Sequence, residues 1–357
     1  MALALAIVVI VVGGGLTALM FYVAFEEGRL SGSGVRVQQA FGVAEEGALE
    51  VLRAWDPRTY NVHDPYPFHS AMVPAGFPAD WTAAPHGTGA YGGQVYKLNS
   101  ELYLIDMTGR DDWGPPPGAS AVRQRVAVLA RVQPVAPGLV AALTVGKGSR
   151  RAGTVSIAGR DGLPPDWEPC GPPDSNRVGL DTVRGGLAAF SSGGFTYAEL
   201  ASLATRSVAG AAVLSNIGPT VVDGRCDETV ATNWGGTQPN QVCGGYLPVV
   251  HIVGAATLAG VDGQGTLLVD GDLTVRGGLR WRGLVLVGGA LRVTPGAAKD
   301  VAVWGAVFAA DSATLEAGVA GSVAITYSKC AVVKALESVA PAVMFSSRGW
   351  LGLSEAP

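Results

Sequence analysis

Gly263-Gln-Gly-Thr-Leu-Leu-Val-Asp-Gly-Asp-Leu273 joins a short apolar run to an Asp-Gly turn, and similar units recur through residues 257–336. The apolar runs start at intervals of roughly 20 residues. Short strands at a near-constant interval are typical of a solenoid, in which each turn buries its apolar face only by stacking on the next. We therefore expect a small right-handed parallel β-helix of about four rungs. A β-sandwich is the alternative, because Asp262-Gly263 and Asp270-Gly271 also suit hairpin turns.

Residues 94–133, well before this repeat in the sequence, have the pattern of an antiparallel sheet. Apolar and polar side chains alternate along residues 94–108 and 122–133, and such period-two patterning is typical of half-buried antiparallel strands. The chain holds 51 glycines and 22 prolines with only 15% charged residues, which favours many short strands over helical bundles. A short helix is expected at residues 195–205, because Thr196 and Glu199 are spaced as a capping box.

The N-terminus has a different character, because no charged side chain occurs before Glu26. A stretch of about 20 apolar residues can span a bilayer core, so we expect a transmembrane helix with membrane lipid as a partner. From Val35 to Trp55 apolar residues recur at helical spacing, which predicts an amphipathic continuation that ends at Asp56-Pro57. The side chains expected to face lipid or a neighbouring helix are Leu3, Leu5, Ile7, Ile10, Leu16, Leu19 and Phe21.

The charge-free start and the segment Gln38-Gln-Ala-Phe-Gly-Val-Ala-Glu-Glu-Gly-Ala-Leu49 resemble the N-terminal region of PilX-type minor pilins, of the type IV pilus and type II secretion pseudopilin class. The motif positions are Gln39, Glu45, Glu46, Gly47 and Leu49. The resemblance covers residues 1–55 and implies that Met1 follows the cut of a prepilin peptidase. It also implies that other pilin-like subunits pack against this helix. Leu5 departs from the pattern, since major pilins carry a glutamate there that pairs with a neighbouring subunit's amino terminus.

These observations predict an α+β chain, in which a long N-terminal transmembrane, pilin-like helix precedes a mainly β region that ends in a short parallel β-helix. We assign residues 1–55 to a membrane and assembly helix, and residues 56–135 to a loop-rich segment with an antiparallel pilin-like sheet. Residues 136–260 are a glycine-rich β region with a short helix and a disulfide loop. Residues 261–336 are the β-helix-like repeat, and residues 337–357 are a C-terminal tail.

The four cysteines are Cys170, Cys226, Cys243 and Cys330. An even number in a chain expected to lie outside the cytosol suggests disulfides. Cys226 and Cys243 enclose a loop of little regular pattern, so we expect this pair first and the other two cysteines as the second pair. Closing such a loop contributes about 3 kcal/mol. A zinc site is the alternative, but no Cys-x-x-Cys spacing is present.

No set of catalytic residues is recognisable. His63 and His69 lie in a proline-rich loop, where solvated histidines are commoner than metal ligands. His251 stands in an apolar strand, where a hydrogen-bonded sheet residue is the simpler interpretation. The remaining histidine is His86. We therefore expect no enzymatic activity and no cofactor.

The aspartates of the repeat offer another candidate site. Asp270 and Asp272, with Asp262 upstream, could form a carboxylate pair or a calcium loop. Asp-Gly is, however, ordinary turn chemistry, and the equivalent later positions carry Gly288, Gly289 and Ser312 instead of acids. Glycoside-active sites need paired acids, so turn formation is preferred and no metal is expected.

The leading hypothesis is a non-enzymatic structural or minor subunit of a type IV pilus or pseudopilus. Such a subunit would be a single-pass protein of the bacterial inner membrane, with its bulk periplasmic or extracellular in a pilus. One alternative is a membrane-anchored protein that binds or degrades a surface polysaccharide, and another is an adhesin in which Trp281 and Trp304 meet a ligand. Nucleic acid is not an expected partner, because the formal net charge is −4 and no basic block occurs.

Overall fold

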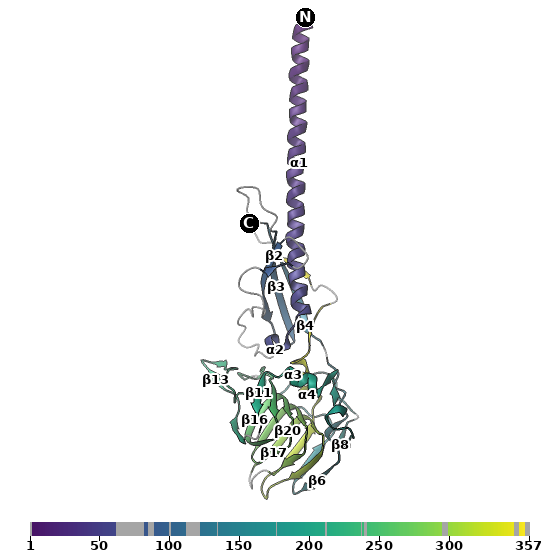
Figure 1. Cartoon of the computed structure of the whole chain (residues 1–357), viewed down its shortest axis with the longest axis vertical. Coiled ribbons are helices and arrows are strands. Elements are labelled where there is room, and N and C mark those ends of the chain that lie inside the picture. Colours follow the sequence, from purple (N-terminus) through teal and green to yellow (C-terminus); the bar gives the residue numbers. More distant parts are fainter. Residues whose placement is uncertain are drawn as a thin grey trace.

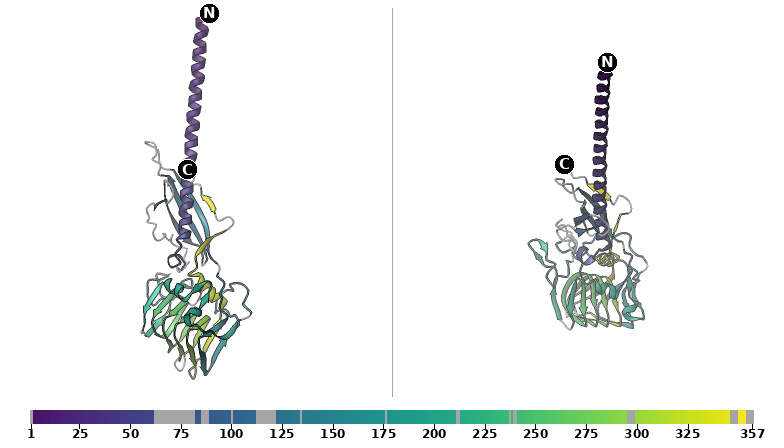
Figure 2. Two further views of the ribbon diagram at one scale, coloured as in Figure 1. Left: turned by 45° about the vertical axis from the view of Figure 1, so that its right-hand side comes forward. Right: turned by 45° about the horizontal axis from the view of Figure 1, so that its top comes forward.

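The computed structural model describes residues 2–61, 82–84, 89–99, 101–111, 122–133, 135–175, 177–210, 213–236, 238, 241–294, 299–345 and 350–353. In helix α1 (Ala2–Arg53), side chains are described for residues 14–24 and 34–53. This helix carries the N-terminus, a small sheet lies beside its C-terminal part, and a larger β unit lies at the far end (Figure 1). Two further views show the same arrangement (Figure 2).

The small sheet covers the C-terminal part of α1. Its pairings are antiparallel. Two of its strands come from the end of the chain and both pair with β4, so C-terminal residues complete a sheet that earlier residues begin. The strands are β1 (Thr82–Ala83), β2 (Gly89–Lys97), β3 (Leu102–Asp111), β4 (Arg123–Val132), β23 (Ala342–Met344) and β24 (Trp350–Leu353), and the short helix α2 (Pro57–Tyr60) follows α1.

Small residues allow α1 to lie close against this sheet. Ala40, Ala44 and Ala48 are fully buried and recur at four-residue spacing, so they form one face of the helix. Opposite them, a Cβ on Gly109 of β3 would collide with the Ala40 carbonyl oxygen and the Ala44 backbone nitrogen. Glycine at this position is therefore required for the close approach of strand and helix.

The larger unit is a parallel β-solenoid with three faces. The first face joins β15 to residues 266–269, 284–287 and 306–309. The second joins residues 256–258 to β17, β19 and β21, and the third joins residues 261–265 and 279–283 to 301–305 and β22. These strands are β15 (Val249–Val253), β16 (Ala256–Val269), β17 (Leu273–Val275), β18 (Leu279–Val287), β19 (Leu291–Val293), β20 (Val301–Ala309), β21 (Ser312–Glu316) and β22 (Val323–Tyr327).

Stacked glycines form the corner between the third and first faces. Gly265, Gly283 and Gly305 are in register across three rungs, and all have positive φ. A Cβ on Gly283 would collide with the Gly265 carbonyl oxygen, and a Cβ on Gly305 would collide with the Gly283 carbonyl oxygen. Each long strand can therefore bend here and continue from one face to the next.

The rungs do not stack in sequence order. Residues 141–158 supply β5, β6 and β7, which pair with β20, β21 and β22, so the earliest rung in the sequence stacks on the last one. At this end β8 pairs with β5, and at the other end β11 pairs with β15 and β12 with β16. Their bounds are β5 (Ala141–Val145), β6 (Gly148–Ala152), β7 (Val155–Ala158), β8 (Val178–Thr182), β11 (Arg206–Ala209) and β12 (Val213–Ile217).

Short elements cover the first face of the solenoid. Val332 and Leu336 of α4 pack with Leu284 of β18 in a cluster separate from the solenoid core. The expected capping box is confirmed in α3, where Thr196 and Glu199 satisfy each other's backbone groups. The elements outside the solenoid rungs are the 3-10 helix η1 (Gly186–Ala189), β9 (Ser191–Ser192), β10 (Phe195–Thr196), α3 (Tyr197–Ser202), β13 (Val221–Val222), β14 (Arg225–Cys226) and α4 (Lys329–Glu337).

The predicted fold class is wrong. The chain is mostly β, with 44% strand and 20% helix, and a nearly closed parallel sheet dominates it. The expectation of an N-terminal transmembrane helix is also wrong, because within the described part of the chain no helix is both long and apolar enough to cross a membrane. The β-sandwich alternative is wrong too, because the strands of the repeat pair in parallel. The expected parallel repeat is present.

Candidate functional site

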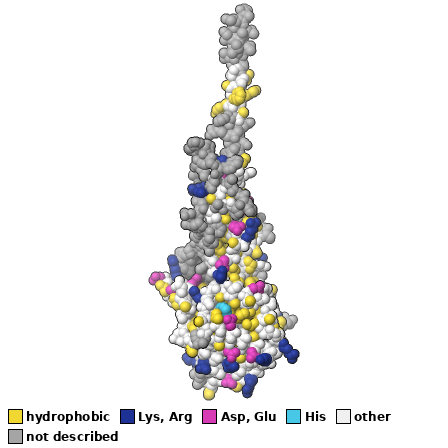
Figure 3. All heavy atoms as spheres, viewed as in Figure 1, with side chains coloured by type: hydrophobic (Ala, Val, Ile, Leu, Met, Phe, Trp, Pro, Cys, Tyr) yellow, Lys and Arg dark blue, Asp and Glu magenta, His cyan; other side chains and the backbone are white. Residues whose placement is uncertain are grey.

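The part of α1 beyond the sheet exposes apolar side chains. Phe21 is 73% exposed, and its neighbours in this segment are similarly open to solvent. Figure 3 shows them as yellow spheres on the projecting helix. The exposed apolar residues described here are Leu16, Leu19, Met20, Phe21, Tyr22 and Val23. The side chains of Leu3, Leu5, Ile7 and Ile10 and the whole of Met1 lie outside the described residues.

The motif residues of α1 lie where the helix meets the sheet. Gly47 is buried, and a Cβ there would stand 2.6 Å from Cδ2 of Tyr91, so this glycine makes room for the tyrosine ring. Burial, and then the charges of Glu50 and Glu46, raise the pKa of Tyr91. Gln39, Glu45, Glu46 and Leu49 are half-buried. Of the motif residues, Gly47 therefore serves the packing of the helix on its own sheet.

An ion pair ties α1 to the end of β3. Arg36 donates to the carboxylate of Asp111, whose Oδ1 also accepts from the backbone N–H of Val122 at 2.7 Å. Burial alone would raise the pKa of Asp111, but these hydrogen bonds outweigh it and lower the pKa. The pair fixes the point at which α1 leaves the sheet.

A second contact joins the small sheet to the solenoid. The Nδ2 of Asn61 donates to the carbonyl oxygens of Glu337 and Ala340, at 2.9 and 2.7 Å. Its Oδ1 accepts from Trp55 Nε1 at 2.9 Å, and its backbone oxygen accepts from Lys97 Nζ at 2.6 Å. One buried side chain thus connects the end of α1 to the segment that follows α4.

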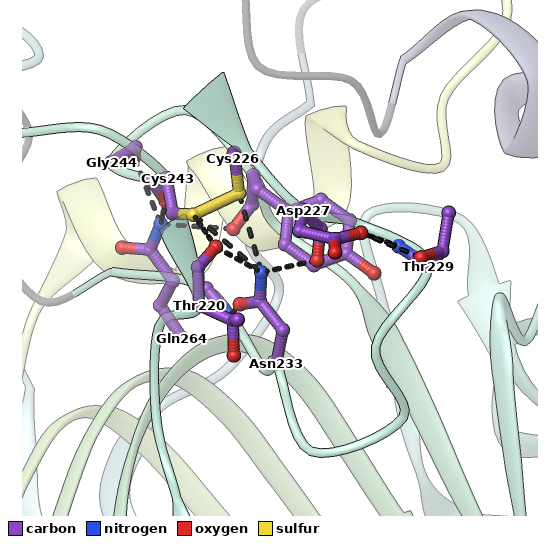
Figure 4. The surroundings of a disulfide bond; sticks show 10 residues. Thr220, Cys226, Asp227, Thr229, Asn233, Cys243, Gly244 and Gln264 are labelled. Atoms are coloured by element: carbon purple, nitrogen blue, oxygen red, sulfur yellow. Dashed lines mark hydrogen bonds between the residues drawn. A yellow bond between two sulfur atoms is a disulfide. The ribbon is translucent and has the colours of Figure 1, made fainter. Parts of the chain in front are cut away.

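The structure brings Cys226 and Cys243 together as a disulfide, with their Cα atoms 4.9 Å apart. Figure 4 shows the polar groups that surround it. Asn233 Nδ2 donates to the Asp227 carbonyl oxygen at 2.9 Å, and Gln264 Nε2 donates to that of Gly244 at 2.8 Å. The disulfide and these amides hold the β13–β14 hairpin on the end of the solenoid.

Cys170 and Cys330 form the other disulfide, with Cα atoms 5.3 Å apart. It attaches the loop after β7 to the first turn of α4. Asp161 of this loop accepts the backbone N–H of Lys329 at 2.9 Å. All four cysteines are therefore paired, and the loop between β7 and β8 is fixed to the helix that covers the first face.

His251 belongs to a polar group on the first face. Its Nε2 lies 2.8 Å from Asp270 Oδ1, and the Tyr197 hydroxyl donates to the same oxygen at 2.8 Å. Burial favours a raised pKa for Asp270, but the hydrogen bonds from His251 and Tyr197 lower it. These contacts tie α3 to the solenoid. His63, His69 and His86 lie outside the described residues.

Asp262 and Asp272 each pair with an arginine of the next rung. Asp262 Oδ2 lies 3.2 Å from Arg280 Nη2, and Asp272 Oδ2 lies 2.6 Å from Arg292 Nη1. Asp272 Oδ1 also accepts the backbone N–H of Ala290 at 2.8 Å. Among the described residues, no group of three or more His, Cys, Asp or Glu side chains could hold a metal ion.

The two tryptophans suggested as ligand contacts differ in position. Trp281 is 0% exposed and packs inside the solenoid against Trp234, so its expected role at a surface is wrong. Trp304 is half-buried on the outer side of the third face, and the guanidinium of Arg282 lies 5.5 Å from its ring centroid.

Sequence reasoning missed Arg36, Asp111 and Asn61, which tie α1 to β3 and the end of α1 to the segment after α4. No local pattern marks them, because their partners lie far away in the sequence. It also missed Arg280, because Arg280 and its partner Asp262 meet only when the rungs stack.

No protein-family model matches the chain, and no curated protein matches it. Comparison with solved structures finds the competence-associated pilin ComZ from Thermus thermophilus, at 14% identity and a TM-score of 0.25. The match covers 90% of this chain and 97% of that one. A likeness at this level carries no conclusion about fold or role, and the PilX-type resemblance is not confirmed.

Proposed function

We propose that this protein is a non-enzymatic, pilin-like structural subunit whose helix α1 packs against the equivalent helices of sister subunits in a pilus or pseudopilus. The supporting observation is the contrast along α1. Its C-terminal part is buried on its own sheet, whereas residues 14–24 project with large apolar side chains open to solvent. The resemblance of residues 1–55 to minor pilins points to the same use of the helix.

Burial of these side chains supplies the driving force. A fully buried Leu, Met or Phe side chain contributes about 1.5–3 kcal/mol relative to exposure. A helix of 52 residues is about 78 Å long, so a projecting segment can contact several neighbours at once. The solenoid lies at the opposite end (Figure 1) and would be displayed on the outside of such an assembly.

The test compares self-association of the full chain with that of the double variant Met20→Asp, Phe21→Asp. Analytical ultracentrifugation and negative-stain microscopy should show oligomers or filaments of the unaltered chain and smaller species for the variant, because buried unpaired carboxylates oppose helix packing. The matched control is Val319→Asp, a fully exposed valine (102%) on a turn of the solenoid. A monomeric unaltered chain, or equal assembly of both aspartate variants, would contradict the proposal.

A further inference from the structure

A groove crosses three rungs of the solenoid where the second face turns into the third. It has a volume of about 680 Å³, within the range of about 300–1,000 Å³ that is usual for ligand sites. Residues 259–262 supply the first rung, residues 277–280 the second, and Lys299 and Asp300 the third. Because neighbouring strands are about 4.8 Å apart, the outer two rungs are roughly 10 Å apart, which suits an extended ligand.

The floor of the groove is backbone. Gly260 has a φ of 73°, and a Cβ on Gly277 would stand 2.8 Å from the Gly260 nitrogen. The apolar residues Val261 and Leu279 are only 3% exposed because they point into the core. The described residues that line the groove therefore offer no apolar pocket of the kind that anchors a peptide side chain or a lipid.

The polar groups of the groove are balanced in charge. Asp262 and Arg280 form an ion pair across two rungs, at 3.2 Å. On the third rung Lys299 stands next to Asp300, whose Oδ1 accepts from the backbone N–H and the hydroxyl of Ser322. Two carboxylates and two cations give no excess positive charge, and a polyanion would need such an excess.

Adjacent donors and acceptors of this kind match the hydroxyl groups of a sugar. A hydroxyl both donates and accepts, so neighbouring hydroxyls can bond to a carboxylate and a guanidinium at the same time. We infer that this groove binds a neutral polysaccharide, which lies across the rungs and contacts Asp262, Arg280, Lys299 and Asp300. This inference concerns the solenoid and does not depend on assembly through α1.

The experiment is isothermal titration calorimetry on the full chain. The probes are the neutral tetrasaccharides cellotetraose, maltotetraose and N-acetylchitotetraose, with tetragalacturonate as the acidic counterpart. At least one neutral probe should bind, and its affinity should be at least tenfold lower for the double variant Asp262→Asn, Arg280→Ala. Lys299→Ala, a change at an exposed position, should weaken it severalfold.

The chain supplies a matched control in Asp272→Asn, Arg292→Ala. This variant removes an equivalent ion pair between rungs, outside the groove, and should leave affinity within twofold of the unaltered chain. Failure of every neutral probe to bind overturns the inference, as does binding of tetragalacturonate alone. The inference is also overturned if a neutral probe binds the groove double variant and Lys299→Ala as tightly as it binds the unaltered chain. Self-association measured in parallel tests the role of α1 separately.

Discussion

The side-chain amide of Asn61 donates a hydrogen bond to the carbonyl oxygen of Ala340, 2.7 Å away, across 279 positions of sequence. Asn61 caps α2 directly after α1, and Ala340 lies between α4 and β23, so this contact lies where the small sheet meets the solenoid. The same residue accepts from Trp55 and Lys97. Asn61 therefore joins the end of α1, the small sheet and the segment that follows α4 through one buried side chain.

Replacement of this asparagine should destabilise the protein. Asn61→Ala leaves the Trp55 indole N–H and the Ala340 carbonyl oxygen without their partner, at about 1–3 kcal/mol for each buried group that stays unsatisfied, while the Glu337 carbonyl oxygen keeps its bond from the Ala340 backbone N–H. We expect a loss of about 3 kcal/mol in the free energy of unfolding, measured by urea denaturation. Asn99→Ala is the control, since the Asn99 side chain accepts from the backbone N–H groups of Glu101 and Leu102 in its own exposed turn. Equal losses in the two variants would show that Asn61 has no special role.

The contact between α1 and β3 should tolerate no added methyl group. Gly109→Ala places a Cβ against the backbone of Ala40 and Ala44, so helix and strand must separate, and we expect a loss of more than about 2 kcal/mol. Gly42→Ala is the matched control, because nothing lies within 4 Å of its added Cβ and alanine is the better helix former by about 1 kcal/mol. The midpoint temperature of thermal unfolding should therefore fall in Gly109→Ala and rise in Gly42→Ala. A stabilised Gly109→Ala variant would contradict this packing.

The sequence predicted those features that repeat or have a local signature. The apolar runs of residues 257–336 predicted parallel stacking, because each rung repeats one pattern of inward side chains. Thr196 and Glu199 predicted α3, because a capping box is a contact between near neighbours. The corner glycines 265, 283 and 305 also repeat, and could have marked the bends.

Features set by distant parts of the chain could not be predicted in this way. Residues 141–158 belong to the expected glycine-rich region 136–260, and nothing in their pattern says that they stack on β20–β22 at the end of the repeat. Residues 342–344 and 350–353 belong to the expected C-terminal tail, yet they pair with β4. The same holds for Asp262 and Arg280 in the groove, since the register between rungs decides which charges meet.

Glu337 should make stability depend on pH near neutrality. Burial, and then the charge of Glu101, raise its pKa from 4.5 to about 7, against a smaller opposing effect of Lys334. A raised folded pKa means that the folded state binds the extra proton. The stabilising contribution is therefore complete below the unfolded pKa of about 4.5 and is lost as pH rises through about 7.

Glu337→Gln isolates this effect from other titrating groups. At pH 8 the variant should be more stable than the unaltered chain by about 2 kcal/mol, after allowance for partial solvent exposure. Below pH 5 the difference should shrink towards zero. The measurement is the difference between the two urea unfolding free energies across this range, and a difference that does not change with pH would contradict the assignment.

The two disulfides should differ in their contribution to stability. Cys226 and Cys243 are 17 positions apart, whereas Cys170 and Cys330 are 160 apart. In the chain-entropy description a cross-link restricts the unfolded state more as its loop lengthens, which gives about 3 kcal/mol for the shorter loop and about 5 kcal/mol for the longer one. We therefore expect Cys170→Ser, Cys330→Ser to lower the unfolding free energy more than Cys226→Ser, Cys243→Ser. Hydrogen exchange separates local from global effects. The variant that lacks Cys226 and Cys243 should speed exchange in the β13–β14 hairpin and leave β18 and β20 protected, because the hairpin loses its covalent link to residues 243–246, which Gln264 bonds to the solenoid. A larger loss of unfolding free energy in Cys226→Ser, Cys243→Ser than in Cys170→Ser, Cys330→Ser would mean that native contacts around the sulfur atoms, and not loop length, decide the contribution of each bridge.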